Sequence, residues 1–180
     1  QVSLKETKVL YRLSRSLIEP QREEDLMQRV VDLVVEGLPA DRVGIVKMDF
    51  EQKRILSKTH SGPGVNKIET EVTFDEMLEG LSGWAIQKRR PAISPKGQPD
   101  ARESHQVQKR RAETDCGSIL VVPLYYQDNV LGTMTAIRRP DQPNFTQHDA
   151  ELAMTMANQA ATAIQNVSLF QQTQQTLAET

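Results

Sequence analysis

The feature that most constrains the fold is a pair of apolar segments separated by a short polar turn. Residues 118–125 and 130–138 are rich in Val, Leu, Ile and Tyr, and Gln127, Asp128 and Asn129 lie between them. β-branched and aromatic residues favour strands, and Asp and Asn tolerate the left-handed backbone of tight turns. The pattern therefore predicts an antiparallel hairpin at the heart of a sheet.

Helical patterns flank this hairpin. Apolar residues at spacings of three and four predict helices over residues 4–18 and 23–38, separated by Pro20. After the hairpin, Thr146 can cap a long closing helix together with Asp149, a variant of the capping box. That helix carries a seam of alanines, which allows a close approach to a sheet or to another helix.

The middle of the chain combines short strands with polar connections. The expected elements are strands over 42–49 and 54–60, a short helix over 83–89 capped by Ser82, and a crossover over 94–112 with one helical turn. Strands joined by short turns, with helices gathered at the two ends, predict an α+β fold around an antiparallel sheet.

The composition limits the class of protein and its partners. With 180 residues, 38% apolar and 26% charged, the chain has the character of one soluble globular domain. Its net charge of −2 gives no reason to expect nucleic acid, and no apolar run is long enough for insertion into a membrane. The single cysteine, Cys116, excludes an internal disulfide and favours a cytoplasmic location. The three histidines lack metal-type spacing.

Several motifs, in order, resemble the GAF domain family. Residues 80–91 look like the family's G-x-x-G-x-A…P helix, and Ser118–Leu124 with 130–132 looks like its central strands. Phe145-Thr-x-x-Asp149 and residues 158–166 look like its closing helix. The resemblance implies α/β/α layers with about six strands, terminal helices on one face, and a short helix and crossover that enclose a pocket on the other.

The resemblance also implies a function. GAF domains of bacterial sensors bind small molecules and regulate an output domain, as in two-component histidine kinases or response regulators, and many are homodimers. The expected division is a linker or dimerisation helix over 1–19, the GAF domain over 20–170, and the start of a helix toward a covalently linked output domain over 171–180. The alternative is a degenerate GAF domain that acts only as a structural dimerisation module.

Catalysis is not expected of this chain. The GAF proteins that reduce free methionine sulfoxide use several cysteines, and Cys116 alone cannot be both nucleophile and resolving thiol. The sequence also lacks a nucleophile elbow and a P-loop. Any activity would belong to the output domain.

The family's known ligands fit the residues poorly, so the cofactor stays unassigned. Bilin attachment needs a cysteine where this chain has His105 and Gln106, and Cys116 comes too late. The signature of cyclic-nucleotide binders is matched only by Phe145 and Asp149, so a cyclic nucleotide is possible but not favoured. A basic residue at Arg139 could still pair with Asp149 and tie a strand end to the closing helix.

A basic segment suggests a different ligand class. Residues 86–111 hold eight basic residues against two acidic ones, a local charge of +6. Bordering a pocket, this segment would concentrate an anionic small molecule by electrostatic steering; alternatively, its long side chains simply solvate the crossover. The candidate pocket residues are Trp84, Arg89, Arg90 and His105, although packing in the core is the more common role for a tryptophan such as Trp84.

Two apolar stripes on the terminal helices suit helix pairing. They are Leu10, Leu13 and Leu17 on the first helix and Ile164 and Val167 on the last. Their spacing fits a homodimer through both helices. The same spacing also fits packing on the domain's own sheet, and the sequence leaves these two alternatives open.

Overall fold

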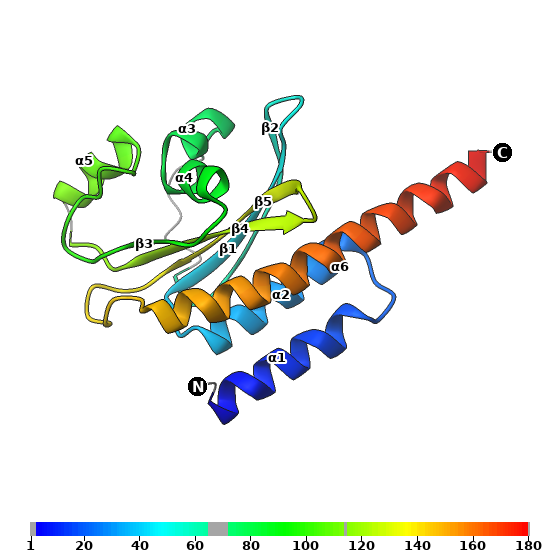
Figure 1. The fold of residues 1–180 in the computed structure, drawn as a ribbon, viewed down its shortest axis with the longest axis horizontal. Coiled ribbons are helices and arrows are strands. Elements are labelled where there is room, and N and C mark those ends of the chain that lie inside the picture. Colours follow the sequence, from blue (N-terminus) through cyan, green and yellow to red (C-terminus); the bar gives the residue numbers. More distant parts are fainter. Residues whose placement is uncertain (1–2, 65–71, 114, 180) are drawn as a thin grey trace.

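The structure is a computed structural model that describes residues 3–64, 72–113 and 115–179. Within these ranges the chain forms six helices and five strands, in an α+β arrangement (Figure 1). In chain order they are α1 (Leu4–Leu17), α2 (Glu23–Gly37), β1 (Arg42–Asp49), β2 (Arg54–Ser61), α3 (Phe74–Glu79), α4 (Leu81–Lys88), β3 (Ala92–Ser94), α5 (His105–Glu113), β4 (Ile119–Tyr126), β5 (Asn129–Ile137) and α6 (Gln147–Glu179).

The sheet is antiparallel throughout its described strands, in the order β2-β1-β5-β4-β3. The predicted hairpin is confirmed as β4–β5, with Leu120 opposite Ala136 and Val122 opposite Met134. The expectation of about six strands is corrected to five in the described residues. β3, only three residues long, was missed because so short a segment has no measurable alternation.

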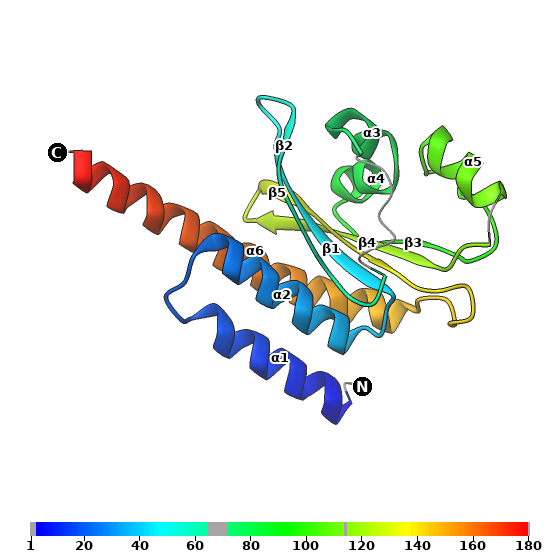
Figure 2. The same ribbon diagram turned by 180° about the vertical axis from the view of Figure 1, so that it is seen from behind.

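Helices cover both faces of the sheet. α2 and α6 lie on one face, with α1 packed outside them, and α3, α4 and α5 lie on the other (Figures 1 and 2). β1 shows how the two faces arise: Val43 and Ile45 are fully buried toward the helical core, while Gly44 and Val46 point to the opposite side. This alternation follows from the two-residue period of a strand.

α6 approaches the sheet closely along its alanine seam. Ala157, Ala160 and Ala161 are fully buried, as are Met156 and Ile164 on the same helix. Small side chains let the helix backbone lie near β4, so α6 and the central hairpin form one packed unit. The capping box at its start is also present, with Thr146 N–H donating to Asp149 Oδ2 at 2.8 Å.

The apolar stripes proposed for dimerisation belong to the domain's own core. Leu13 and Ile164 are buried, at 0% and 1% exposure, and Leu10, Leu17 and Val167 pack against the same cluster. The sequence could not decide this, because a helix that packs on its own neighbours has the same spacing as one that pairs with a second chain. The exposed apolar side chains of α6 are instead Leu169, Phe170 and Leu177.

The predicted ion pair is shifted by one residue. Asp149 Oδ2 lies 3.7 Å from Arg138 Nη1, whereas Arg139 pairs with Asp141. Side chains alternate along β5, so Arg138 continues the face of Met134 and Ala136 toward α6, and Arg139 points to solvent. Arg138 also donates from Nε to the Pro39 carbonyl at 2.8 Å.

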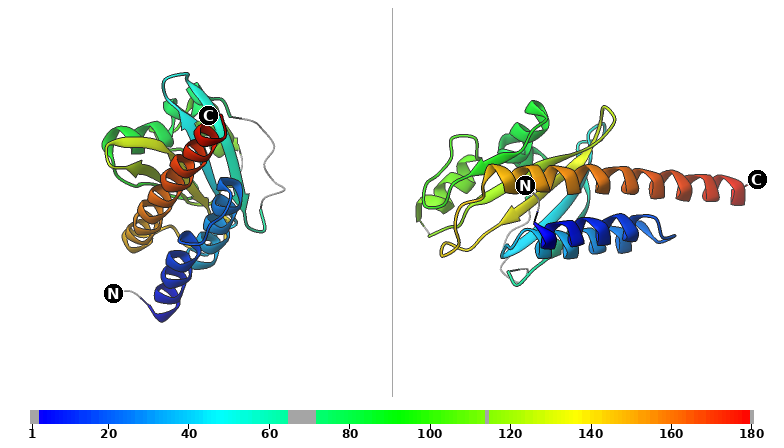
Figure 3. Two further views of the ribbon diagram at one scale, coloured as in Figure 1. Left: turned by 90° about the vertical axis from the view of Figure 1, so that its right-hand side faces the viewer. Right: turned by 60° about the horizontal axis from the view of Figure 1, so that its bottom comes forward.

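A polar cluster ties the sheet to the distal half of α6. Lys47 Nζ of β1 lies 2.7 Å from Glu23 Oε1 of α2 and 3.3 Å from Ser168 Oγ of α6. Ser168 Oγ also donates to Glu23 Oε1 at 2.8 Å. Beyond this cluster α6 continues away from the domain with its residues exposed (Figure 3). Among the described residues, no helix has the length and apolar character required to cross a bilayer.

Candidate functional site

A cavity of about 440 Å³ lies between the sheet and the layer formed by α3, α4 and α5. Its lining comes from β1, β2, β4 and β5 below and from the three helices above. The lining side chains include Arg42, Val46, Lys58, His60, Glu76, Met77, Leu81, Ser82, Glu103, Val107, Arg110, Arg111, Cys116, Ile119, Val121, Thr135 and Ile137. The cavity therefore occupies the face of the sheet that α2 and α6 leave uncovered.

Gly44 makes room for a histidine in the floor of this cavity. Gly44 on β1 lies opposite His60 on β2. A Cβ built on Gly44 would lie 2.6 Å from His60 Nδ1, which is closer than real side chains approach. The imidazole of His60 therefore lies across the glycine and forms part of the surface that a bound molecule would meet.

Basic side chains surround this histidine. Arg42 precedes Gly44 on the same face of β1, Lys58 precedes His60 on β2, and Arg110 reaches the cavity from α5. Burial lowers the pKa of His60, and the charges of Arg42 and Lys58 lower it further. Burial likewise lowers the pKa of Arg42; the charge of Asp41 opposes this shift and the charge of Arg110 adds to it. Burial is the main cause of both shifts, and repulsion between neighbouring cations is a smaller one.

The carboxylates that line the cavity are already engaged. Glu76 forms the capping box of α3 with Thr73, accepting the Thr73 backbone N–H. Glu103 is buried beside Arg111, with Glu103 Oε1 3.3 Å from Arg111 Nε, and it accepts the Asp100 backbone N–H. Burial raises the pKa of Glu103. Among the described lining residues, basic side chains outnumber carboxylates.

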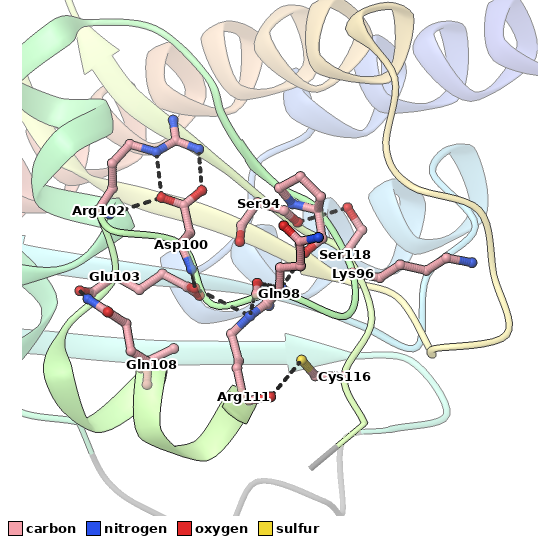
Figure 4. Close-up of polar contacts among 12 residues, drawn as sticks. Ser94, Lys96, Gln98, Asp100, Arg102, Glu103, Gln108, Arg111, Cys116 and Ser118 are labelled. Carbon is pink, nitrogen blue, oxygen red and sulfur yellow. Dashed lines mark hydrogen bonds and ion pairs between the residues drawn. The ribbon is translucent and has the colours of Figure 1, made fainter. Parts of the chain in front are cut away.

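Arg111 organises the wall on the α5 side. Its guanidinium donates to the carbonyls of Pro95, Gln98 and Gly117 in addition to pairing with Glu103. Figure 4 shows Glu103 and Gln98 gathered around the Arg111 side chain, with Cys116 close to the end of α5. The buried Arg111 side chain thereby holds together the segment between β3 and β4 that borders the cavity.

The four residues predicted for the pocket lie elsewhere. Trp84 packs against the small core between α4 and β4, and its ring is covered by Arg90 and Arg102, at 5.0 and 4.7 Å from its centroid. Arg89 ends α4 in a left-handed conformation, and its guanidinium lies 4.3 Å from the Tyr125 ring centroid. His105 is exposed at the start of α5. The basic segment does border the cavity, through Arg110 and Arg111, but the four predicted side chains do not line the cavity.

The strand residues of the site were missed by sequence reasoning. Both strands that carry Arg42, Lys58 and His60 were correctly predicted. Alternation places residues 42 and 44 on the same face of the first strand, and residues 58 and 60 on the same face of the second. The pairing that brings the two sets together depends on the register of β1 and β2. Arg110 is the one cavity residue of this set that belongs to the predicted basic segment.

Comparison with known proteins agrees with this architecture. The family model described as "GAF domain" matches residues 20–165. The chain belongs to the GAF domain family. None of the curated proteins compared matches it.

Solved GAF structures share the fold at low sequence identity. The GAF domain of a phosphoenolpyruvate-protein phosphotransferase from Coxiella burnetii is 19% identical, with a TM-score of 0.70 and coverage of 92% of this chain and 96% of that one. The nlh2 GAF domain of A. aeolicus, in an inactive state, is 18% identical, with a TM-score of 0.66 and coverage of 90% and 96%. These likenesses show the fold alone.

A third solved structure is an enzyme. Free methionine-R-sulfoxide reductase from Neisseria meningitidis, in complex with its substrate, is 17% identical, with a TM-score of 0.71 and coverage of 94% of this chain and 95% of that one. The likeness again concerns the fold. Within its described residues, this GAF domain has no group of three His, Cys, Asp or Glu side chains arranged to hold a metal ion.

Proposed function

We propose that this GAF domain is a regulatory module that binds a small anionic molecule in its cavity. The observation that carries the proposal is that Arg42, Lys58, His60 and Arg110 line one cavity, in which the described carboxylates Glu76 and Glu103 each already accept a backbone hydrogen bond. Charged groups in a partly buried site attract an opposite charge more strongly than they would in bulk water. An anion relieves the mutual repulsion of these groups and accepts hydrogen bonds from them.

The size of the cavity supports a metabolite as the ligand. A volume of about 440 Å³ lies within the range of small-molecule sites. Apolar side chains, among them Val46, Met77 and Ile119, complete the lining. This combination suits a molecule with an anionic group at one end and an apolar or neutral body.

The connection between floor and helix provides a route for the signal. β1 carries Arg42 and Gly44 on its cavity face and Lys47 on its opposite face, where Lys47 holds Ser168 of α6. A displacement of β1 on ligand binding would change this attachment and therefore the direction of the helix beyond it. We infer that α6 passes the change to a covalently linked output domain, such as a histidine kinase or a response-regulator partner in a bacterial cytoplasmic pathway, and that the domain itself is not an enzyme.

Removing the charge of Arg42 should weaken anion binding about tenfold or more, because charge-assisted hydrogen bonds contribute about 1.5–3 kcal/mol. The measurement is titration calorimetry of Arg42→Gln and wild type with sulfate, pyrophosphate and citrate, after a thermal-shift survey of the same anions. The double variant Arg89→Gln/Arg90→Gln is the matched control, since it removes two charges from the basic segment outside the cavity. Equal affinities for wild type and Arg42→Gln would refute the proposal, and so would a loss of binding in the control alone.

The second candidate function is dimerisation through α6, and one observation favours it. Phe170 and Leu177 form a stripe, are 64% and 70% exposed and lie seven residues apart, which is the spacing of one coiled-coil heptad. A homodimer would pair this stripe with its copy and could coexist with ligand binding. An empty cavity combined with a stable dimer would indicate the purely structural module.

Charges placed in this stripe test the pairing. Phe170→Lys/Leu177→Lys should convert a sedimenting dimer into a monomer, because two pairs of like charges would face each other across the helix seam. Leu56→Lys, an equally polar change at a 44% exposed leucine of β2, should leave the dimer intact. A wild type that sediments as a monomer at about 100 μM, a weak-association threshold, would exclude this mode of pairing.

A further inference from the structure

We propose that anion binding in the cavity is coupled to protonation of His60, so that the domain takes up one proton from solvent together with its ligand. The inference rests on the proposed function, since it concerns the regulation of the same site. It follows from the position of the imidazole among the cationic groups of the floor.

The imidazole is held in the floor by the packing of two strands. Its ring lies across Gly44, which has no side chain to displace it. The backbone carbonyl of His60 accepts a hydrogen bond from Gln28 Nε2 of α2 at 3.1 Å, which fixes the strand at this position. The strand is thereby fixed with the His60 ring lying over Gly44 in the floor of the cavity.

Among the described residues, charged side chains line the cavity from several elements, and Asp41 acts on Arg42 from outside the lining. Arg42 comes from β1, Lys58 from β2 and Arg110 from α5, while Glu76 of α3 and Glu103 beside α5 are engaged by Thr73 and Arg111. In the empty cavity a proton on His60 would add a further positive charge to this set. Burial and the charges of Arg42 and Lys58 accordingly keep the pKa of His60 below its ordinary value of 6.5.

A bound anion reverses this balance. A negative charge beside the ring favours the imidazolium, and the protonated ring can donate from a nitrogen that would otherwise present a lone pair. The proton moves from solvent to the ring, and no covalent bond of the ligand changes. The pKa of His60 is then higher in the complex than in the free domain.

The direction of the pH dependence follows from this difference. Because the complex holds the proton more tightly than the free domain, affinity rises as pH falls through the pKa of the complex. It levels off once the pH is below the pKa of the free domain. Between the two values the dissociation constant changes by about tenfold per pH unit for one proton. The domain thereby responds to acidity as well as to ligand concentration.

Sulfate is a suitable probe, because its own charge stays constant over the range in which histidine titrates, about pH 5 to 8. The ring resonances of His60 are followed by NMR against pH in the full chain, with and without sulfate at matched ionic strength. We expect the pKa of His60 to rise by about one unit or more on saturation, which corresponds to tenfold coupling. His105, exposed on α5, and His148, paired with Glu6, lie outside the cavity and serve as internal controls.

The variant His60→Gln removes the titrating group and keeps a polar side chain of similar length. Sulfate affinity of this variant should be independent of pH, whereas the wild type should bind about tenfold more tightly per unit of acidification. Sulfate that shifts the Arg42 and Arg110 resonances without moving the pKa of His60 would overturn the coupling and leave the proposed function standing. Absence of any sulfate effect on these arginines would overturn both, and the wild-type NMR result decides even where the variant fails to fold.

Discussion

Replacing Arg111 with methionine is expected to lower the free energy of unfolding by about 3–5 kcal/mol, the cost of leaving a buried charge without its partner. Arg111 and Glu103 have side-chain exposures of only 3% and 1%. The variant would leave the buried Glu103 carboxylate without its cationic partner. It would also remove the hydrogen-bond donor to the carbonyls of Pro95, Gln98 and Gly117. Chemical denaturation of the full chain measures the effect.

Two further variants separate charge from packing at this site. Lys109→Met removes one cation from an exposed position of the same helix and should change stability by less than about 0.5 kcal/mol. The double variant Glu103→Gln/Arg111→Met should be more stable than Arg111→Met alone, because no uncompensated charge remains. An Arg111→Met variant as stable as Lys109→Met would show that the Glu103–Arg111 pair does not stabilise the α5 side of the cavity.

The same variant should respond to pH in a defined direction. Burial already raises the pKa of Glu103 in the intact domain, and loss of the Arg111 charge raises it further. Protonation at acidic pH neutralises the Glu103 carboxylate that has lost its partner. The destabilisation caused by Arg111→Met should therefore shrink as the pH is lowered from neutrality.

The second large effect is expected at Gly132, where alanine should cost about 3 kcal/mol or more through a direct backbone clash. Gly132 lies on β5 opposite Lys47 of β1, with φ of +153°. A Cβ there would lie 1.9 Å from the Val46 carbonyl oxygen, so β1 and β5 would have to separate. Both strands contribute to the cavity floor, and ligand binding should weaken together with stability.

A second glycine separates the clash from the backbone conformation. Gly97 also has a positive φ, +78°, and a Cβ there would meet nothing within 4 Å. Gly97→Ala should therefore cost only the conformational strain, about 1 kcal/mol. Thermal unfolding midpoints of the two variants give the comparison, and equal shifts would mean that β1 and β5 adapt without cost.

The predicted elements succeeded where the information was local. The hairpin, both N-terminal helices, the first two strands and the capped start of α6 were recognised from alternation, apolar spacing and capping residues, each within a short stretch. The start of α4 was misplaced because Gly80, rather than Ser82, is its N-cap, and Ser82 lies inside the helix near Thr133. β3 and α3 are too short for periodicity to define them.

The candidate site shows where local reasoning ended. Trp84, Arg89 and Arg90 were chosen because their segment was expected to border the pocket. In the structure Arg90 and Arg102 pack on Trp84, and Arg89 packs on Tyr125. His60 and Arg42 were not chosen, since nothing in their own segments marks them as ligand-facing. The partner of Asp149 is Arg138 rather than the predicted Arg139 for a related reason. Which of two neighbouring residues at a strand end points toward the helix depends on how side chains alternate along that strand.

The sequence alone determined the long helices, the two hairpins and the basic character of residues 86–111, because propensity, turn chemistry and charge act over neighbouring residues. The resemblance of its ordered motifs indicated the GAF family and placed that basic segment beside a pocket. The tertiary structure decided which side chains meet. The register that sets Gly44 against His60, the burial of Leu13 and Ile164 within one chain and the hydrogen bond from Lys47 to Ser168 each join residues from different elements of the chain. Such contacts depend on how packed elements fit in three dimensions, and no single segment carries that information.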